Sequence, residues 1–121
     1  MKYLCLIYDD ESKFATISKS DMDAMYKEYG AFTESVKASG NYVAGHQLQP
    51  TRSASTVRVR NGQVSTTDGP FAETKEQLGG FYLIEATDLN AAIQIAAKIP
   101  SARYGSIEVR PLVQAAAQAA G

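Results

Sequence analysis

The stretch "KYLCLIY", Lys2 to Tyr8, is apolar on both faces of the strand that it predicts. A strand of this kind is typical of the middle of a sheet that is covered on two sides. The stretch "GFYLIEA", Gly80 to Ala86, has the same character and predicts a second central strand. We expect the remaining elements to be arranged around these two strands.

A helix is predicted from about Lys19 to Ser39, because apolar residues recur there at helical spacing. Ser18 and Ser20 are each followed by an Asp three residues later, which predicts an N-terminal cap, and Gly40 predicts the stop. The recurring apolar residues, which we interpret as core, are Met22, Met25, Tyr26, Tyr29, Phe32 and Val36.

Further strands are predicted at "YVAGHQL", Tyr42 to Leu48, and at "SIEVRPL", Ser106 to Leu112. A second helix is expected between them in the chain, after the last central strand. Asp88 is predicted to cap its N-terminus, and Pro100 ends it.

A β-hairpin is predicted between the two halves of the chain. "TVRVR" and "QVSTT" flank Asn61-Gly62, a strong signal for a two-residue turn. A loop of two residues places Val59 opposite Val64 and Val57 opposite Thr66.

This order of elements predicts an α+β fold, a ferredoxin-like sandwich with an inserted β-hairpin. Two helices cover only one face of such a sheet, whereas the central strands are apolar on both faces. We therefore expect a homodimer in which a second copy packs sheet on sheet. Residues 1–112 are expected to form one domain, followed by an alanine-rich tail at 113–121.

Composition narrows the classes of function. The 121 residues, 45% hydrophobic and 21% charged, are typical of one soluble globular domain. The net charge is −1, and Lys and Arg are scattered along the sequence, so we do not expect direct binding to nucleic acid. The N-terminal apolar run is too short for a membrane span or a signal peptide, so we expect a cytoplasmic protein. With one Cys and one His, we expect neither a metal site nor a cofactor. Cys5 is expected to be a small buried hydrophobic residue.

The stretch "TTDGPFAETKEQLGG", Thr66 to Gly80, is the densest polar region of the chain. Gly69 and Pro70 predict a rigid turn, and Phe71 is expected to insert into the core. The charged residues around this turn and a Gly79-Gly80 hinge are either solvated loop charges or the wall of a site. They are Asp68, Glu73, Lys75 and Glu76.

His46 is the lone histidine, and strand alternation puts it on one face with Tyr42, Ala44 and Leu48. We expect it to be partly buried there. Either it satisfies a hydrogen bond in the core, or it meets Asp68 and forms a pair suited to acid-base catalysis.

Other candidates for lining a cleft lie near strand ends. Tyr8 ends the first strand, and Arg103 precedes the last one. In a catalytic interpretation, Lys75 or Arg103 holds an anionic substrate and Glu73 contributes to ligand binding. A structural role is an equal alternative for each.

Four stretches together carry a family resemblance, and they cover nearly the whole chain before the tail. They are "MKYLCLIY", "LQPTRSASTVRVRNG", "DGPFAETKEQLGGFYLIEA" and "PSARYGSIEVRPL". The chain resembles the DGPF branch of the YCII-related family. This resemblance implies a dimeric α+β barrel, a His and Asp pair in related enzymes, and association with extracytoplasmic-function sigma factors. His46 departs from the branch pattern, so its pairing with Asp68 is a hypothesis about this chain alone.

Three functions remain open from the sequence. The first is a small-molecule enzyme that uses acid-base residues near the DGPF loop. The second is a noncatalytic ligand-binding or regulatory module that acts with a sigma factor. The third, by fold analogy, is a cofactor-independent monooxygenase or a haem-handling protein.

Overall fold

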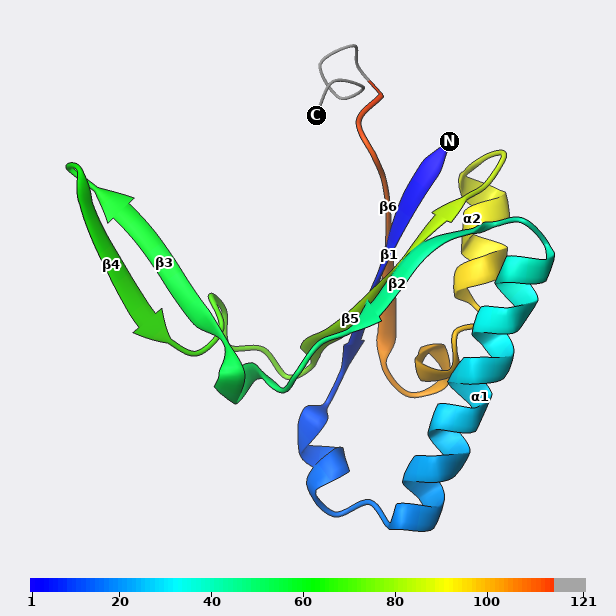
Figure 1. The fold of residues 1–121 in the computed structure, drawn as a ribbon, viewed down its shortest axis with the longest axis horizontal. Coiled ribbons are helices and arrows are strands. Elements are labelled where there is room, and N and C mark those ends of the chain that lie inside the picture. The colour runs from blue at the N-terminus through cyan, green and yellow to red at the C-terminus, as the bar shows by residue number, and fades with distance from the viewer. Residues whose placement is uncertain (115–121) are drawn as a thin grey trace.

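A computed structural model describes residues 1–114 and shows one four-stranded antiparallel sheet (Figure 1). The strand order is β2-β5-β1-β6. This order, with a helix after β1 and another after β5, is that of a ferredoxin-like α+β sandwich, so the predicted fold class is confirmed. The strands are β1 Lys2–Asp9, β2 Tyr42–Gln47, β5 Gln77–Glu85 and β6 Ser106–Pro111.

Two α-helices of the described residues, α1 Lys19–Ala38 and α2 Leu89–Ala96, lie on the same side of the sheet (Figure 1). The side chain of Ser18 caps α1 by accepting from the Asp21 amide, and Asp88 caps α2 in the same way. Short 3₁₀ helices complete the body at η1 Glu11–Ala15, η2 Thr51–Ser53 and η3 Pro100–Arg103.

The core lies between the sheet and the helices. Along β1, Tyr3, Cys5 and Ile7 are buried against the helices, while the intervening residues are only half-buried on the opposite face. Burial raises the pKa of the Cys5 thiol to about 11, so this side chain is the inert buried hydrophobe that was expected.

A bulge in β2 changes which residues share a face. Tyr42 lies opposite Ile84 and packs on the core, but the pairing with β5 shifts between Tyr42 and Ala44. His46 therefore lies opposite Phe81, on the face away from the helices, and its side chain is exposed. The prediction that His46 shares a face with Tyr42 and is partly buried was wrong for this reason.

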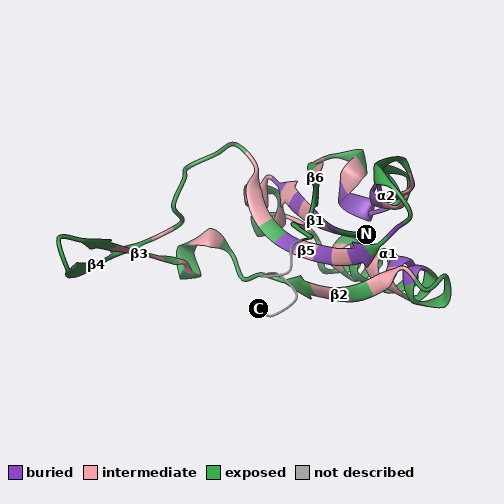
Figure 2. Ribbon diagram, turned by 90° about the horizontal axis from the view of Figure 1, so that it is seen from above, coloured by how far each residue is buried: buried purple, intermediate pink, exposed green. Residues whose placement is uncertain are grey.

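The inserted hairpin forms an arm that projects from the body (Figure 2). It consists of β3 Ser55–Arg60 and β4 Gln63–Asp68, with the predicted register of Val59 opposite Val64. Asn61 and Gly62 both have positive φ, as a two-residue hairpin turn requires.

Two predictions about the polar stretch after the arm were wrong. Phe71 does not enter the core but is 80% exposed, and the guanidinium of Arg58 lies 5.7 Å from its ring centre. Gly79 and Gly80 are not a hinge, because both belong to β5, where the pairing with β1 shifts by one residue. Gly69, with φ +104°, has the unusual backbone angle that the sequence indicated.

The predicted alanine-rich tail falls largely on residues 115–121, which lie outside the described residues. No helix among residues 1–114 is long and apolar enough to cross a membrane.

Gly45 lies against the core side chain of Tyr82, and it provides a test of the packing. A Cβ at Gly45 would lie 2.7 Å from Cδ1 of Tyr82, whose ring packs edge-on to Phe32. We expect Gly45→Ala to lower the free energy of unfolding by about 1–3 kcal/mol. Gly30→Ala is the matched control, because a Cβ there meets no atom within 4 Å on an exposed helix face. Gly30→Ala should raise the free energy of unfolding by about 0.5–1 kcal/mol. Urea titration of both variants measures the two effects. Equal effects of the two changes would contradict this account.

Candidate functional site

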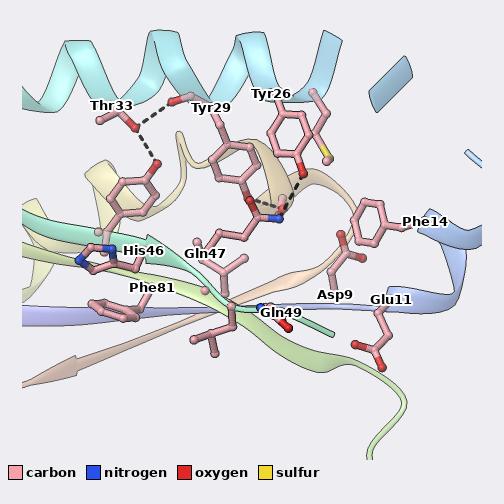
Figure 3. A pocket seen from close by; sticks show the side chains of 18 of the residues that line it. Asp9, Glu11, Phe14, Tyr26, Tyr29, Thr33, His46, Gln47, Gln49 and Phe81 are labelled. Atoms are coloured by element: carbon pink, nitrogen blue, oxygen red, sulfur yellow. Dashed lines mark hydrogen bonds between the residues drawn. The ribbon is translucent and has the colours of Figure 1, made fainter. Parts of the chain in front are cut away.

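A pocket of about 460 Å³ lies between α1 and the sheet (Figure 3). Side chains from η1, α1, β1, β2 and β5 line it, and most of its surface is apolar. Met22 and Met25 of α1 contribute, so these residues are pocket walls rather than the pure core that the sequence indicated. The aromatic lining residues on the helix side of the sheet are Phe14, Tyr26, Tyr29, Tyr42 and Tyr82.

Two of the tyrosine hydroxyls are fixed by partners within the protein. Tyr29 bonds to Ser101. Thr33 donates to the carbonyl of Tyr29, so the Tyr82 hydroxyl is the donor in its 2.7 Å bond to Thr33. Burial is the main cause that raises the pKa of Tyr29 and of Tyr82, so both remain protonated at neutral pH. These groups shape the pocket and do not titrate in it.

Tyr26 has a weaker partner. The amide nitrogen of Gln47 lies 3.4 Å from its hydroxyl, which is long for a hydrogen bond, and both side chains are exposed (Figure 3). The pair therefore retains capacity to bond a second molecule. We call Tyr26 and Gln47 the amide–phenol pair.

Asp9 is the one carboxyl of the described lining residues that is buried, with 7% of its surface exposed. Its Oδ1 accepts from the Asp10 amide at 2.8 Å and lies 3.9 Å from Nζ of Lys13. Its Oδ2 is buried and has no hydrogen-bond partner among residues 1–114. An unpaired buried oxygen of this kind is costly and calls for an explanation, and a catalytic or ligand-binding role is one that the pocket offers.

Burial is the largest cause that raises the pKa of Asp9, and the neighbouring charges of Glu76 and Asp10 add to it. The Asp10 amide and Lys13 oppose the shift without cancelling it. The Asp9 carboxyl is consequently a stronger base, once ionised, than an ordinary aspartate.

Glu11, which lines the pocket, is hydrogen-bonded to the chain on both sides of the arm. Its carboxylate accepts from the amide and the hydroxyl of Thr51, where the chain enters the arm. Its own amide donates to Oε1 of Gln77, where the chain returns to the sheet. Within the described part of the chain, no group of three His, Cys, Asp or Glu residues is arranged to hold a metal ion.

The two residues predicted to be catalytic lie in different sheets. His46 borders the pocket from β2, but its ring lies on the face of the sheet away from the helices, with its centre 5.8 Å from that of Phe81. Asp68 is exposed at the end of β4 in the arm. No hydrogen bond or ion pair joins them within residues 1–114, so a His46–Asp68 pair stays a prediction.

The predicted ligand-binding residues are not among the described residues that line the pocket. Tyr8 is half-buried on β1, and Glu73 and Lys75 are exposed in the loop after the arm. Arg103 pairs with Glu28 at 2.7 Å on the surface.

Asp9 is the residue that sequence reasoning missed, although a signal was present. Tyr3, Cys5 and Ile7 alternate on the buried face of β1, and Asp9 is the next residue in that series. A carboxyl that continues a buried face points to a specialised site.

The four-stranded antiparallel sheet with both helices on one face places the chain in the class of ferredoxin-like α+β proteins. The fold is similar to that of 5-chloro-2-hydroxyhydroquinone dehydrochlorinase (TftG) from Burkholderia phenoliruptrix AC1100, solved in complex with 2,5-dihydroxybenzoquinone. The TM-score is 0.53 at 15% identity, over 95% of this chain and 96% of that one. At this identity the similarity shows the fold alone.

Sequence comparison gives the family. The profile of the YCII-related domain matches residues 1–116, and the chain belongs to this family. The uncharacterized protein R00369 of Rhizobium meliloti (strain 1021) is 40% identical over 114 residues, which are 93% of this chain and 92% of that protein. The predicted family is thereby confirmed, and the DGPF branch stays a prediction.

The raised pKa of Asp9 predicts a pH-dependent cost in stability. The folded state holds this proton more tightly than the unfolded state does. The contribution of Asp9 to the free energy of unfolding therefore falls as pH rises above about 3.9, the ordinary pKa of an aspartate. We expect Asp9→Asn, which keeps the acceptor for the Asp10 amide and removes the buried charge, to stabilise the protein at neutral pH. The gain should disappear in acid.

Asp10→Asn is the control, and its effect has the opposite sign. Hydrogen bonds from the Ser12 hydroxyl and amide lower the pKa of Asp10, so its stabilisation is present at neutral pH and lost as pH falls. Asp10→Asn should therefore destabilise at neutral pH. Urea unfolding measured from neutral pH into the acid range gives the stability of both variants. A loss of stability in Asp9→Asn at neutral pH would refute the conclusion that Asp9 is a destabilising buried carboxyl.

Proposed function

We propose that this protein is a small-molecule enzyme of acid-base type, and that Asp9 transfers the proton. The observation that carries the proposal is the buried, unpartnered Oδ2 of Asp9 in a pocket with aromatic walls. A pocket of this size that combines apolar walls with one specialised polar group is the usual form of a small-molecule site.

The chemistry follows from the environment of the carboxyl. A general base works best when its pKa approaches the working pH, and the environment of Asp9 raises its pKa in that direction. The Oδ2 has no hydrogen bond within residues 1–114 that must first be broken, so a small movement of the side chain toward the pocket would let it accept a proton from a bound molecule. The apolar walls exclude water, which strengthens the interaction between this oxygen and a substrate.

The comparisons support this proposal at the level of class. The similar structure is that of an enzyme, a dehydrochlorinase that acts on a hydroxylated ring compound. The same sheet and helices therefore host small-molecule chemistry in another protein, while the residues that perform it here must be argued from this site.

Acid-base catalysis is detected as exchange of substrate hydrogen with solvent, even before the full reaction is known. We would incubate the protein in D₂O with uncharged hydroxy- and keto-substituted ring compounds and follow deuterium incorporation by proton NMR. We expect exchange with at least one compound, and a loss of about 100-fold or more in Asp9→Asn. Asp23→Asn, an exposed carboxyl on α1 outside the pocket, is the control and should exchange like the wild type.

The same assay decides between Asp9 and the pair predicted from sequence. If His46→Gln and Asp68→Asn both abolish exchange while Asp9→Asn does not, His46 and Asp68 are the proton-transfer groups. His46 borders the same pocket, although its ring lies on the face away from the helices, and this position is what favours it as the second candidate. Binding of ring compounds without exchange in any variant would favour the noncatalytic regulatory module, for which a sigma factor is the partner to test.

The uncovered face of the sheet supports a second proposal, that the chain forms a homodimer. Leu4 and Leu6 on β1 lie opposite Leu83 and Phe81 on β5, on the face away from the helices. None of these apolar side chains is fully buried in the single chain. A second copy packed sheet on sheet would remove them from water.

The homodimer is tested by sedimentation velocity. We expect the wild type to sediment as a dimer, and Leu6→Lys to sediment as a monomer because a charge in the middle of the interface is costly to bury. Val113→Lys makes the same change at an exposed position outside the sheet and should remain dimeric. A wild-type monomer at micromolar concentration would remove the proposal.

A further inference from the structure

The charge of the pocket lining limits what the pocket can bind. Two carboxyl groups, Asp9 and Glu11, are among the described lining residues, and no described Lys or Arg is. Lys13 is the nearest cation to Asp9, but its side chain is 53% exposed and it faces Oδ1, not the free Oδ2. An anionic ligand would therefore meet negative charge in the pocket without a matching cation.

The sequence pointed to the opposite ligand charge, through Lys75 or Arg103. The structure locates both outside the described lining of the pocket, and Arg103 is already paired with Glu28. A carboxylate or phosphate group buried at this pocket would lose its hydration and gain no ion pair, which is strongly unfavourable.

A cationic ligand is disfavoured for a different reason. An ammonium group would lose its hydration against the apolar walls, and the burial that raises the pKa of Asp9 opposes the ionised carboxylate that would have to compensate it. A hydroxyl group has no such requirement, because it can donate to the ionised carboxylate or accept from the protonated carboxyl. An uncharged hydroxyl thus matches Oδ2 in both states.

A second polar position exists in the pocket. The amide–phenol pair of Tyr26 and Gln47 is held by one long contact of 3.4 Å and has unused hydrogen-bonding groups. Figure 3 shows this pair as separate from Asp9, with aromatic side chains around both positions. A ring that lies against these walls would carry polar groups toward each position.

We propose that the pocket binds an uncharged ring compound with two oxygen substituents, one bonded to Asp9 and the other to the amide–phenol pair, and that it rejects the anionic counterpart. This inference rests on the proposed function, since it names the substrate class of the same pocket. It adds the charge, the ring and the two anchoring positions.

Three compounds that share a hydroxyphenyl ring test the charge preference by isothermal titration calorimetry. They are 2-(4-hydroxyphenyl)ethanol, 4-hydroxyphenylacetate and tyramine, which carry an uncharged, a negative and a positive group. We expect the alcohol to bind about tenfold or more tightly than either charged compound, a difference that one unmatched charge readily produces. Tighter binding of the acetate or of tyramine, or absence of binding by the alcohol at millimolar concentration, would overturn the inference.

Two variants test the anchoring positions. Asp9→Asn should weaken binding of the alcohol about tenfold and narrow its advantage over the acetate, because the negative charge has been removed. A merely structural role of Asp9 would lower the affinity for all three compounds alike. Gln47→Leu should weaken 2-(4-hydroxyphenyl)ethanol but not 2-phenylethanol, which lacks one oxygen substituent. Equal losses for both compounds would exclude the amide–phenol pair as an anchor.

Failure of this inference is distinguishable from failure of the proposed function. If the charged compounds bind best but deuterium exchange still depends on Asp9, the inferred substrate class is wrong and the proposed acid-base function is supported. If the alcohol binds as expected but no compound exchanges, the pocket has the inferred selectivity and the protein is not an acid-base enzyme.

Discussion

The pairing of β1 between β5 and β6 is the constraint on which the site depends. Because β1 is paired on both sides, its residues cannot rotate, and every second side chain must face the helices. Tyr3, Cys5 and Ile7 fill the core on that face, and the same alternation carries Asp9 under η1 and α1. A carboxyl is thereby buried by the geometry of the strand and not by a partner that would neutralise it.

The fold could be predicted from the sequence because its signals are local and agree with one another. Helical spacing in α1, the Ser18 cap and the Asn61-Gly62 turn each specify one element without reference to the rest of the chain. The errors fall where the outcome depends on tertiary pairing. The bulge after Tyr42 changes the face on which His46 lies, and the register shift at Gly79 converts an expected hinge into part of β5.

The site was harder to predict because its residues look ordinary in one dimension. Met22 and Tyr26 follow the same helical spacing as Phe32, yet only the packing of the helix against the sheet decides which of them line a pocket. Near the N-terminus of α1, residues of η1, α1 and β1 surround the space that forms the pocket. The periodicity of the sequence does not indicate where such a space forms.

The polar stretch after the arm has, in large part, a structural explanation. Thr56 donates to the Gly69 carbonyl, Glu76 accepts from the Ser106 hydroxyl, and Gln77 bonds both Thr74 and the Glu11 amide. These bonds fix the route by which the chain leaves the arm and enters β5 beside Asp9. Glu76 also adds its charge to the environment that raises the pKa of Asp9. The stretch therefore affects the site through the position of the chain and the charge of Glu76, and in the proposed function the proton is transferred by the Asp9 carboxyl that β1 buries.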